Sequence, residues 1–370
     1  MKNYGDLDTS PRVLLGPGPS TVHPRVLRAM AHPLVGHLDP EFVALMNEVQ
    51  DLLRHVYQTE NTLTVPVSGT GSAAMEASLC NFIEPGDAVL IGVCGYFGER
   101  LCDMASRYGA KVRRIDRPVG EVFEVAEFEA ELKKEPAKLV AMVHAETSTG
   151  ALQPIEGMAE VVHRYGGILV IDCVTSLGGI PVKIDEWGVD VAYSCSQKCL
   201  GAPSGLGPIT VSPRAVDVLK ARKTPVANWY LDLSLLARYW GNERTYHHTA
   251  PISMNYALRE ALRMVAEEGL EARFARHRAN AELLWEGLEE MGMGLFVPLD
   301  HRLPQLTTVR IPAGIDELKI RKELLNTYNI EIAGGLGPTK GKVWRIGLMG
   351  YSSQPQNVLM LLAALKHLIR

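Results

Sequence analysis

The stretch Ser194-Cys195-Ser196-Gln197-Lys198-Cys199-Leu200 is the part of the sequence from which the fold is best interpreted. It follows an apolar run, Val189 to Tyr193, that is typical of a buried strand, and it leads into a Gly/Pro/Ser loop, Gly201 to Gly207. Lys198 is therefore predicted at the end of a strand, with almost no charge close in sequence. A solvated surface lysine is the ordinary interpretation, because lysine is rarely buried without a partner, and a lysine kept for chemistry is the alternative.

Strand and helix patterns alternate along the chain before Lys198. Apolar strands are predicted at residues 63–67, 88–93, 111–115, 138–144 and 168–173. Helices are predicted from Asp39-Pro40 to residue 56, from a glycine turn to about residue 83, and over 97–108, 125–134 and 155–165. This alternation is typical of a mostly parallel sheet covered by helices, so we predict the α/β class. Ligands of such sheets bind at the carboxyl ends of the strands.

The C-terminal third has a different pattern. Residues 252–293 are helical in pattern, and they are followed by a predicted strand, helix, strand and helix at 305–311, 315–328, 342–347 and 354–368. This order predicts a smaller α+β domain. We therefore predict an N-terminal arm at residues 1–20, a large domain at 21–268 and a small C-terminal domain at 269–370.

Composition excludes several classes of protein. The 370 residues have a net charge of −4 and no dense basic run, so nucleic acid is not an expected partner. No apolar run approaches the length of a membrane span, and Met1 to Ser10 lack the apolar core of a signal peptide. The six cysteines include no C-x-x-C pair, so we expect reduced thiols, no metal site and a cytoplasmic protein.

A glycine turn, Ser68-Gly69-Thr70-Gly71-Ser72, lies between a predicted strand and a predicted helix. Free backbone N–H groups and the positive end of the helix would favour an anion there, most naturally a phosphate. The turn also matches the G-x-G-x-x-A dinucleotide fingerprint, so a nicotinamide enzyme is an alternative. That alternative needs an acid at the end of the next strand, whereas the strand 88–93 ends in Cys94-Gly95-Tyr96-Phe97 and the nearby Asp87 precedes it.

Polar groups follow two other strands. His144 to Gly150 provides hydroxyls and a tight turn, and Asp172 ends a run of four aliphatic residues. A helix cap or an internal ion pair would also explain Asp172. The aromatic pair Tyr96-Phe97 would either cover a flat ring or pack in the core, and the sequence favours neither interpretation over the other.

Three further features remain to be interpreted. The neighbours His247 and His248 are not expected to chelate a metal together, since side chains at i and i+1 diverge on a helix or strand. Arg345 lies within an otherwise apolar strand, so it is either an exposed edge arginine or a buried fork for a carboxylate. The loop Gly16 to Ser20 is either a linker or a place of close backbone approach to a ligand.

One cofactor, pyridoxal 5′-phosphate, would use these groups together. The Lys198 amine would condense with its aldehyde to a Schiff base, and the Asp172 carboxylate would keep its ring nitrogen protonated. The glycine turn would hold its phosphate, and an aromatic side chain would cover its ring. This conjunction favours a catalytic lysine over a surface lysine.

These residues lie within longer segments that resemble the class V, fold-type I aminotransferases, and most closely their alanine–glyoxylate (serine–pyruvate) members. The resemblance runs nearly from end to end and is carried by residues 15–20, 58–61, 68–71, 146–150, 176–179, 196–198, 246–249 and 334–338. It implies that Lys198 forms the Schiff base and that Asp172 partners the pyridinium nitrogen. It implies that the other cofactor contacts come from Thr70, Gly71, Ser72 and Gln197 at the phosphate, Phe97 and Val174 on the ring faces, and Thr147 near the ring hydroxyl.

The same resemblance implies contacts beyond one subunit and beyond the cofactor. Tyr246 and Thr249 would reach the phosphate of a neighbouring subunit, which makes the protein a homodimer with shared active sites. Gly18 and Arg345 would bind substrate, with Arg345 gripping its carboxylate. The chain departs from the animal alanine–glyoxylate enzymes, which have Trp, His and Ser in place of Phe97, Ser72 and Thr147, and this puts affinity in doubt more than activity.

The expected activity is a ping-pong transamination of a small amino acid, alanine or serine, with a small 2-oxo acid, glyoxylate or pyruvate. A related class V enzyme with another donor, such as (S)-ureidoglycine, is the first alternative, and decarboxylation or desulfuration with the same cofactor is another. A nicotinamide-dependent oxidoreductase and a catalytically silent binding protein are the remaining alternatives.

Overall fold

A seven-stranded sheet forms the centre of the larger part of the molecule. The structure is a computed structural model and describes residues 4–369. In spatial order the strands are β2 (Leu63–Ser68), β10 (Leu206–Val211), β9 (Val191–Tyr193), β8 (Ile168–Asp172), β5 (Leu139–Val143), β3 (Ala88–Val93) and β4 (Lys111–Asp116). The strands from β4 to β9 pair in parallel, and β10 is antiparallel to both of its neighbours. The predicted mostly parallel α/β sheet is confirmed.

Helices pack on this sheet. They are α1 (Pro24–Met30), α2 (Pro40–Tyr57), α3 (Gly71–Cys80), α4 (Tyr96–Arg107), α5 (Val125–Lys134), α6 (Met158–Arg164), α7 (Ile184–Trp187), α8 (Pro213–Lys220), α9 (Leu233–Trp240) and α10 (Ile252–Glu268). The start of α2 follows the sequence prediction, since the Asp39 side chain accepts a hydrogen bond from Glu41 N and Pro40 occupies the first turn. Its buried face, which includes Phe42 and Val49, joins a core that continues through the sheet.

Strand β10 was not predicted, because the sequence stretch Leu206-Gly207-Pro208 resembles a loop. Proline cannot donate a ladder hydrogen bond and is therefore rare in central strands. In the structure Pro208 lies directly opposite Pro66 of β2, so two residues without an N–H group face each other. Gly207 allows α3 to pack closely, because a Cβ there would lie 2.7 Å from the Cβ of Ala74. The predicted loop is thus wrong from Leu206 onward.

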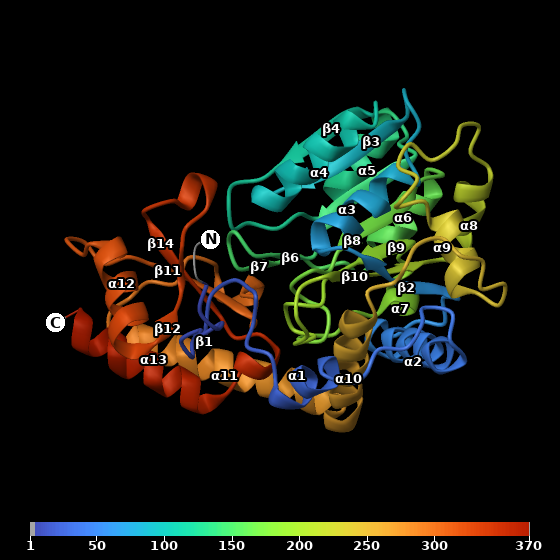
Figure 1. The fold of residues 1–370 in the computed structure, drawn as a ribbon. Coiled ribbons are helices and arrows are strands. Elements are labelled where there is room, and N and C mark those ends of the chain that lie inside the picture. Colours follow the sequence, from blue (N-terminus) through green and yellow to red (C-terminus); the bar gives the residue numbers. More distant parts are fainter. Residues whose placement is uncertain (1–3, 370) are drawn as a thin grey trace.

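The C-terminal part forms its own sheet and core. Its elements are α11 (Leu270–Glu290), β11 (Leu306–Arg310), α12 (Glu317–Tyr328), β12 (Ile330–Glu331), β13 (Ala333–Gly334), β14 (Val343–Gly347), α13 (Pro355–Leu368) and the 3-10 helices η1 (Leu299–His301), η2 (Gly337–Thr339) and η3 (Gly350–Ser352). Figure 1 shows this unit, in orange and red, beside the unit that contains the large sheet. The helical pattern of 252–293 is divided at Gly269, whose φ of 80° ends α10.

The hydrophobic cores support a division of the chain, with one change to the predicted arm. One core contains residues from Val26 to Val265, and a second contains Leu15 together with residues 284–365. Residues Val13–Leu14 form β1, which pairs with β12. We propose the arm, large domain and small domain at the predicted bounds, with the end of the arm attached to the small domain; residues 1–3 of the arm lie outside the described residues.

Asp190 connects three strands at the edge of the sheet where β8 and β9 begin and β10 ends. It is buried, and its side chain accepts hydrogen bonds from Leu169 N at 2.8 Å and Ser212 Oγ at 2.9 Å, while His163 Nε2 lies 2.7 Å away. Replacing it by alanine would leave buried donors unpaired, so we expect Asp190→Ala to lower the free energy of unfolding by about 2–4 kcal/mol. Equilibrium urea unfolding measures this loss.

The exposed Asp300→Ala variant is a control and should stay within about 0.5 kcal/mol of the wild type. A value for Asp190→Ala as small as the control would show that Asp190 does not hold the strands together.

Candidate active site

A cavity of about 160 Å³ lies at the carboxyl ends of β5 and β8. It is lined by Thr70, Gly71, Ser72, Met75, Phe97, Arg100, Val143, Ala145, Thr147, Asp172, Val174, Thr175, Gln197 and Lys198. The structure therefore brings together nine of the predicted site residues, which come from five separate segments of the chain. This position agrees with the general rule for ligands of parallel sheets.

Lys198 is half-buried in the loop that follows β9. Burial lowers the pKa of its ammonium group, while the thiols of Cys195 and Cys199 oppose this shift. Its Nζ donates a hydrogen bond to Pro17 O, so the side chain points toward the loop between β1 and α1. Gly18 is required in that loop, because its φ is +106° and a Cβ would come within 2.5 Å of Lys198 Nζ.

The backbone around Lys198 is held by distant parts of the chain. Gln197 O accepts a hydrogen bond from Ser20 N at 2.9 Å, and Lys198 O accepts one from Ser20 Oγ at 2.8 Å. Cys199 O accepts a hydrogen bond from Arg273 Nη2 at 2.6 Å. No role of Arg273 was predicted, because a charged residue in a long helical pattern is indistinguishable from a surface residue.

Arg273 is itself fixed on its other side. It is buried in α11, its Nη1 lies 2.7 Å from a carboxylate oxygen of Glu268, and its Nε donates to Gly178 O at 2.7 Å. Gly178 belongs to the turn that follows β8. One guanidinium group thus connects the backbone after Asp172 to the backbone after Lys198.

Asp172 is the last residue of β8, and 2% of its surface is exposed. Its Oδ1 accepts a hydrogen bond from Val174 N and its Oδ2 accepts one from Tyr193 Oη, both at 2.8 Å. Burial raises the pKa of Asp172 to about 7, and these two hydrogen bonds oppose the shift. No helix begins directly after Asp172, so it is not a helix cap, and both donors are uncharged, so they form no ion pair with it. A cation beside this carboxylate would stabilise its charge.

The glycine turn forms the other end of the cavity. Thr70 is the N-cap residue of α3, and its side chain makes no capping hydrogen bond. Gly71 allows a close approach, because a Cβ there would lie 3.0 Å from Cys195 Cβ. Within residues 4–369, Gln197 Oε1 and Thr175 Oγ1 are buried without a hydrogen-bond partner. Such atoms indicate a ligand or water, and Thr175 was not predicted.

Arg100 is a second residue that the sequence interpretation missed. Its Nη1 donates a hydrogen bond to Ser72 Oγ at 3.1 Å, and its guanidinium carbon lies 4.8 Å from the centre of the Phe97 ring. It therefore places a positive charge beside the glycine turn. Arg100 follows Phe97 in α4 by less than one turn, and this spacing was the available signal.

Arg345 lies in β14 and is 9% exposed. Its Nε donates to Gly334 O at 2.8 Å and its Nη1 donates to Thr147 O at 3.2 Å. Arg345 is therefore not an exposed edge arginine, since it is buried in the central strand of its sheet. Neither acceptor is a carboxylate, so neither neutralises the charge of the guanidinium.

Tyr246 and Thr249 are not part of the cavity. Both are exposed, Tyr246 to 58%. The expectation that His247 and His248 diverge is wrong, since their Nδ1 atoms lie 2.8 Å apart. Helix and strand geometry does not apply there, because the segment between α9 and α10 has no regular structure.

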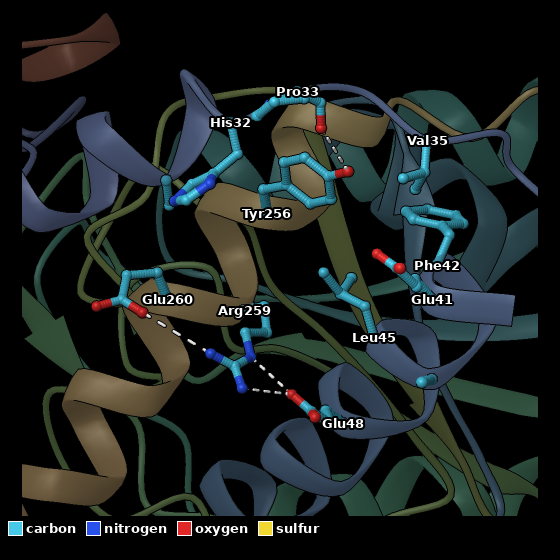
Figure 2. A pocket seen from close by; sticks show the side chains of 12 residues that line it. His32, Pro33, Val35, Glu41, Phe42, Leu45, Glu48, Tyr256, Arg259 and Glu260 are labelled. Carbon is cyan, nitrogen blue, oxygen red and sulfur yellow. Dashed lines mark hydrogen bonds and ion pairs between the residues drawn. The ribbon is translucent and has the colours of Figure 1, made fainter. Parts of the chain in front are cut away.

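A larger hollow of about 520 Å³ lies elsewhere, between α1, α2 and α10 (Figure 2). Tyr256 Oη donates to Pro33 O at 3.2 Å, and Arg259 lies between Glu48 and Glu260, 2.6 Å and 4.0 Å from their carboxylate oxygens. None of the predicted site residues lines this hollow. We therefore place the site in the smaller cavity.

Residues 4–369 contain no group of three or more His, Cys, Asp or Glu side chains that would hold a metal ion. Among the helices of the same residues, none has the length and apolar character needed to cross a membrane.

The cavity fits pyridoxal 5′-phosphate by its donors and acceptors. A half-buried amine, a buried carboxylate with only neutral donors, and a helix start at a glycine turn lie around one space. These groups match an aldehyde, a protonated ring nitrogen and a phosphate.

Comparison with known proteins gives the family. Residues 13–356 match the family model described as aminotransferase class-V. The chain belongs to the class V aminotransferases, which are enzymes that depend on pyridoxal 5′-phosphate. The predicted fold-type I class and cofactor are confirmed, and the nicotinamide alternative is excluded.

Three relatives show which members of this class the chain is similar to. The solved alanine–glyoxylate aminotransferase from Nostoc sp. is 57% identical, with 100% of this chain and 98% of that chain covered and a TM-score of 0.99. The solved ureidoglycine–glyoxylate aminotransferase from Bacillus subtilis is 45% identical, with 99% and 94% covered and a TM-score of 0.97. The alanine–glyoxylate aminotransferase of Mus musculus is 42% identical over 368 residues, which are 98% of this chain and 89% of the mouse protein.

Proposed function

We propose that the protein transfers an amino group from alanine or serine to glyoxylate, with pyruvate as a second acceptor. The observation that carries this proposal is the enclosure of Lys198, Asp172 and the glycine turn around one cavity. The relatives support the acceptor, because glyoxylate is named in the alanine and in the ureidoglycine enzymes. The same residues would serve both half-reactions of a ping-pong cycle.

When bound, pyridoxal 5′-phosphate supplies an aldehyde that exchanges amino groups and a ring that accepts electrons. We propose that the Lys198 amine binds the aldehyde and then, once displaced, moves the α-proton of the substrate. Its lowered pKa favours the neutral amine that both tasks require. The Asp172 carboxylate holds the proton on the ring nitrogen.

The resemblance to the class V aminotransferases supports the remaining proposed contacts. Thr70, Gly71, Ser72 and Gln197 would hold the phosphate, Phe97 and Val174 would contact the two ring faces, and Thr147 would lie near the ring hydroxyl. Arg345 would bind the substrate carboxylate as a fork. Gly18 would leave room between the Gly16–Ser20 loop and the Lys198 amine.

We also propose a homodimer in which Tyr246 and Thr249 of one subunit reach the phosphate site of the other. Their exposure supports this arrangement, as do the neighbouring exposed side chains of Trp229 and Tyr230. Six buried cysteines without disulfides support a reducing compartment, and we propose the cytoplasm.

Steady-state kinetics of purified enzyme with alanine, serine and (S)-ureidoglycine as donors, each against glyoxylate and pyruvate, tests the proposed reaction. The proposal expects the highest kcat/KM for alanine or serine with glyoxylate. The second candidate is the ureidoglycine–glyoxylate reaction, which the 44% identity to the Bacillus subtilis (S)-ureidoglycine–glyoxylate transaminase favours. A preference for (S)-ureidoglycine over both amino acids would replace the first candidate by the second.

Arg345→Lys is expected to raise the KM for the amino donor by about 10- to 100-fold. A lysine offers one point charge in place of a planar fork and cannot form the same paired hydrogen bonds with a carboxylate. Kinetics with alanine and glyoxylate measure this change. Arg310→Lys in the neighbouring strand β11 is the control, because Arg310 is exposed and should leave KM unchanged. An unchanged KM in Arg345→Lys would remove Arg345 from the substrate site.

A further inference from the structure

Glu146 is a buried carboxylate that the proposed reaction does not use. It ends the short strand β6 (Ala145–Glu146), which pairs with β7 (Ala151–Leu152), and 1% of its surface is exposed. Burial raises its pKa, and hydrogen bonds from Ser148, Phe97 and Gly98 oppose that shift. A buried carboxylate needs hydrogen-bond partners that compensate for its lost hydration.

The partners of the Glu146 carboxylate are hydrogen-bond donors. Its Oε1 accepts hydrogen bonds from Ser148 N at 3.0 Å and Ser148 Oγ at 2.6 Å, and its Oε2 accepts one from Phe97 N at 3.1 Å. Ser148 Oγ in turn accepts a hydrogen bond from Tyr96 N at 3.0 Å. Both oxygens are therefore engaged as acceptors, which favours the ionised form.

These bonds replace a local cap on α4. The N-cap residue of α4 is Gly95, which has no side chain to satisfy the first N–H groups. Glu146 and Ser148 satisfy the N–H groups of Phe97 and Tyr96 from another segment, and the negative charge suits the positive end of the helix. The fit is tight, because a Cβ on Gly95 would lie 2.5 Å from Glu146 Cδ.

The same segment holds Arg345. Glu146 O accepts a hydrogen bond from Gly150 N at 2.8 Å, which closes a tight turn. Within this turn Thr147 O accepts the hydrogen bond from Arg345 Nη1 at 3.2 Å. Burial lowers the pKa of the Arg345 guanidinium, and the negative charge of Glu146 partly opposes this shift.

We propose that Glu146 is a positioning residue that fixes the N-terminus of α4, and with it the Phe97 ring, to the turn that holds Arg345. This inference rests on the proposed function, in which Phe97 covers one face of the cofactor. The carboxylate does not touch the cofactor in this scheme and acts through Phe97. Glu146 connects α4 to the turn 146–150, although it does not itself line the cavity. Retention of the cofactor would therefore depend on a residue outside the cavity lining.

Glu146→Gln tests the proposal with little change in shape. One end of the amide is an NH₂ group, which cannot accept from Phe97 N or from Ser148, so one set of hydrogen bonds is lost. Titration of cofactor-free protein with pyridoxal 5′-phosphate, followed by absorbance, should give a dissociation constant at least about 10-fold higher than that of the wild type. Amide hydrogen exchange at residues 96–98 of the cofactor-free variant should be at least about 10-fold faster.

A double-mutant cycle with Phe97→Leu shows whether Glu146 acts through Phe97. In the Phe97→Leu background, Glu146→Gln should change the dissociation constant by less than about 2-fold, because the contact through which it acts is already lost. Gly95→Ala keeps the carboxylate but displaces it, and it should also weaken cofactor binding. The exposed Glu156→Gln is the matched control and should leave the dissociation constant unchanged.

Each outcome has a distinct meaning. If Phe97→Leu weakens binding but Glu146→Gln leaves it within 2-fold of the wild type, the positioning role is overturned and the proposed function stands. Full additivity of the two substitutions also overturns the positioning role. If Phe97→Leu itself leaves binding unchanged, both this inference and the proposed role of Phe97 are overturned.

Discussion

Lys198→Ala is expected to lower kcat for transamination by at least about 10⁴-fold. The substitution removes the amine that would bind the cofactor aldehyde and also the base that would move the α-proton, and proton transfer alone contributes about 10²- to 10⁴-fold. Alanine fits without strain, since the Lys198 side chain ends at Pro17 O and Gly18 rather than in the core of the sheet. Assays with alanine and glyoxylate measure the loss.

Two measurements separate lost chemistry from lost structure in the Lys198→Ala variant. Urea unfolding should show that the fold persists. Borohydride treatment of the wild type with cofactor should attach a label to Lys198, and the variant should remain unlabelled. Lys220→Ala, at an exposed position at the end of α8, should keep full activity and the label. Turnover by Lys198→Ala near that of the wild type would refute the proposed chemistry.

Asp172→Asn is expected to lower kcat by about 10³-fold. Asparagine preserves the shape and still accepts from Val174 N, but it carries no charge to hold a proton on the ring nitrogen. Loss of one partner of a buried charge pair costs about 2–5 kcal/mol, and each 1.36 kcal/mol corresponds to a tenfold change in rate. Single-turnover kinetics with alanine, which isolate the first half-reaction, measure this change.

The pH dependence of the cofactor-free protein provides an independent test of Asp172. Its pKa is raised by burial to about 7 in the folded state, from an ordinary value of 3.8. The stability that protonated Asp172 provides is therefore complete below about pH 4 and is lost as the pH rises to about 7. Asp172→Asn cannot ionise, so its advantage in unfolding free energy over the wild type should grow across this range by up to about 4 kcal/mol.

Urea unfolding of both cofactor-free proteins at several pH values measures this difference. With cofactor bound, a positive ring nitrogen would pair with the carboxylate, and the advantage of the variant should disappear. A difference that stays constant with pH would mean that Asp172 is ionised in the empty site, and it would contradict the role of burial described above.

Local signals explain why much of the fold was predictable. The start of α2 is determined by Asp39 and Pro40, which act on adjacent residues, and Asp172 is conspicuous because it ends an aliphatic strand. Strand β10 was missed because its own composition resembles a loop. Its proline is accommodated because Pro208 lies opposite Pro66 of β2, a residue remote in sequence. The class of enzyme was predictable because its motifs are also local.

Contacts between distant segments explain what was missed at the site. Arg273 donates to Cys199 O from helix α11, and Thr175 lines the same cavity as Lys198 because the strands that precede them, β8 and β9, are neighbours in the sheet. Arg100 looked like one of many charged residues on a helix until its contact with Ser72 placed it at the glycine turn. Such roles follow from tertiary geometry that no periodicity in the sequence encodes.

The hydrogen bonds that hold the backbone around Lys198 have a consequence for biosynthesis. Ser20 leaves the ribosome early, whereas Arg273 and Arg345 are among the later residues to emerge, and all three are needed to complete the surroundings of the lysine. A nascent chain that has just exposed Lys198 therefore carries this amine without the burial that lowers its pKa. We therefore expect the reactive centre to be complete only near the end of translation, and chains that end before Arg273 to be inactive even where their large sheet has formed.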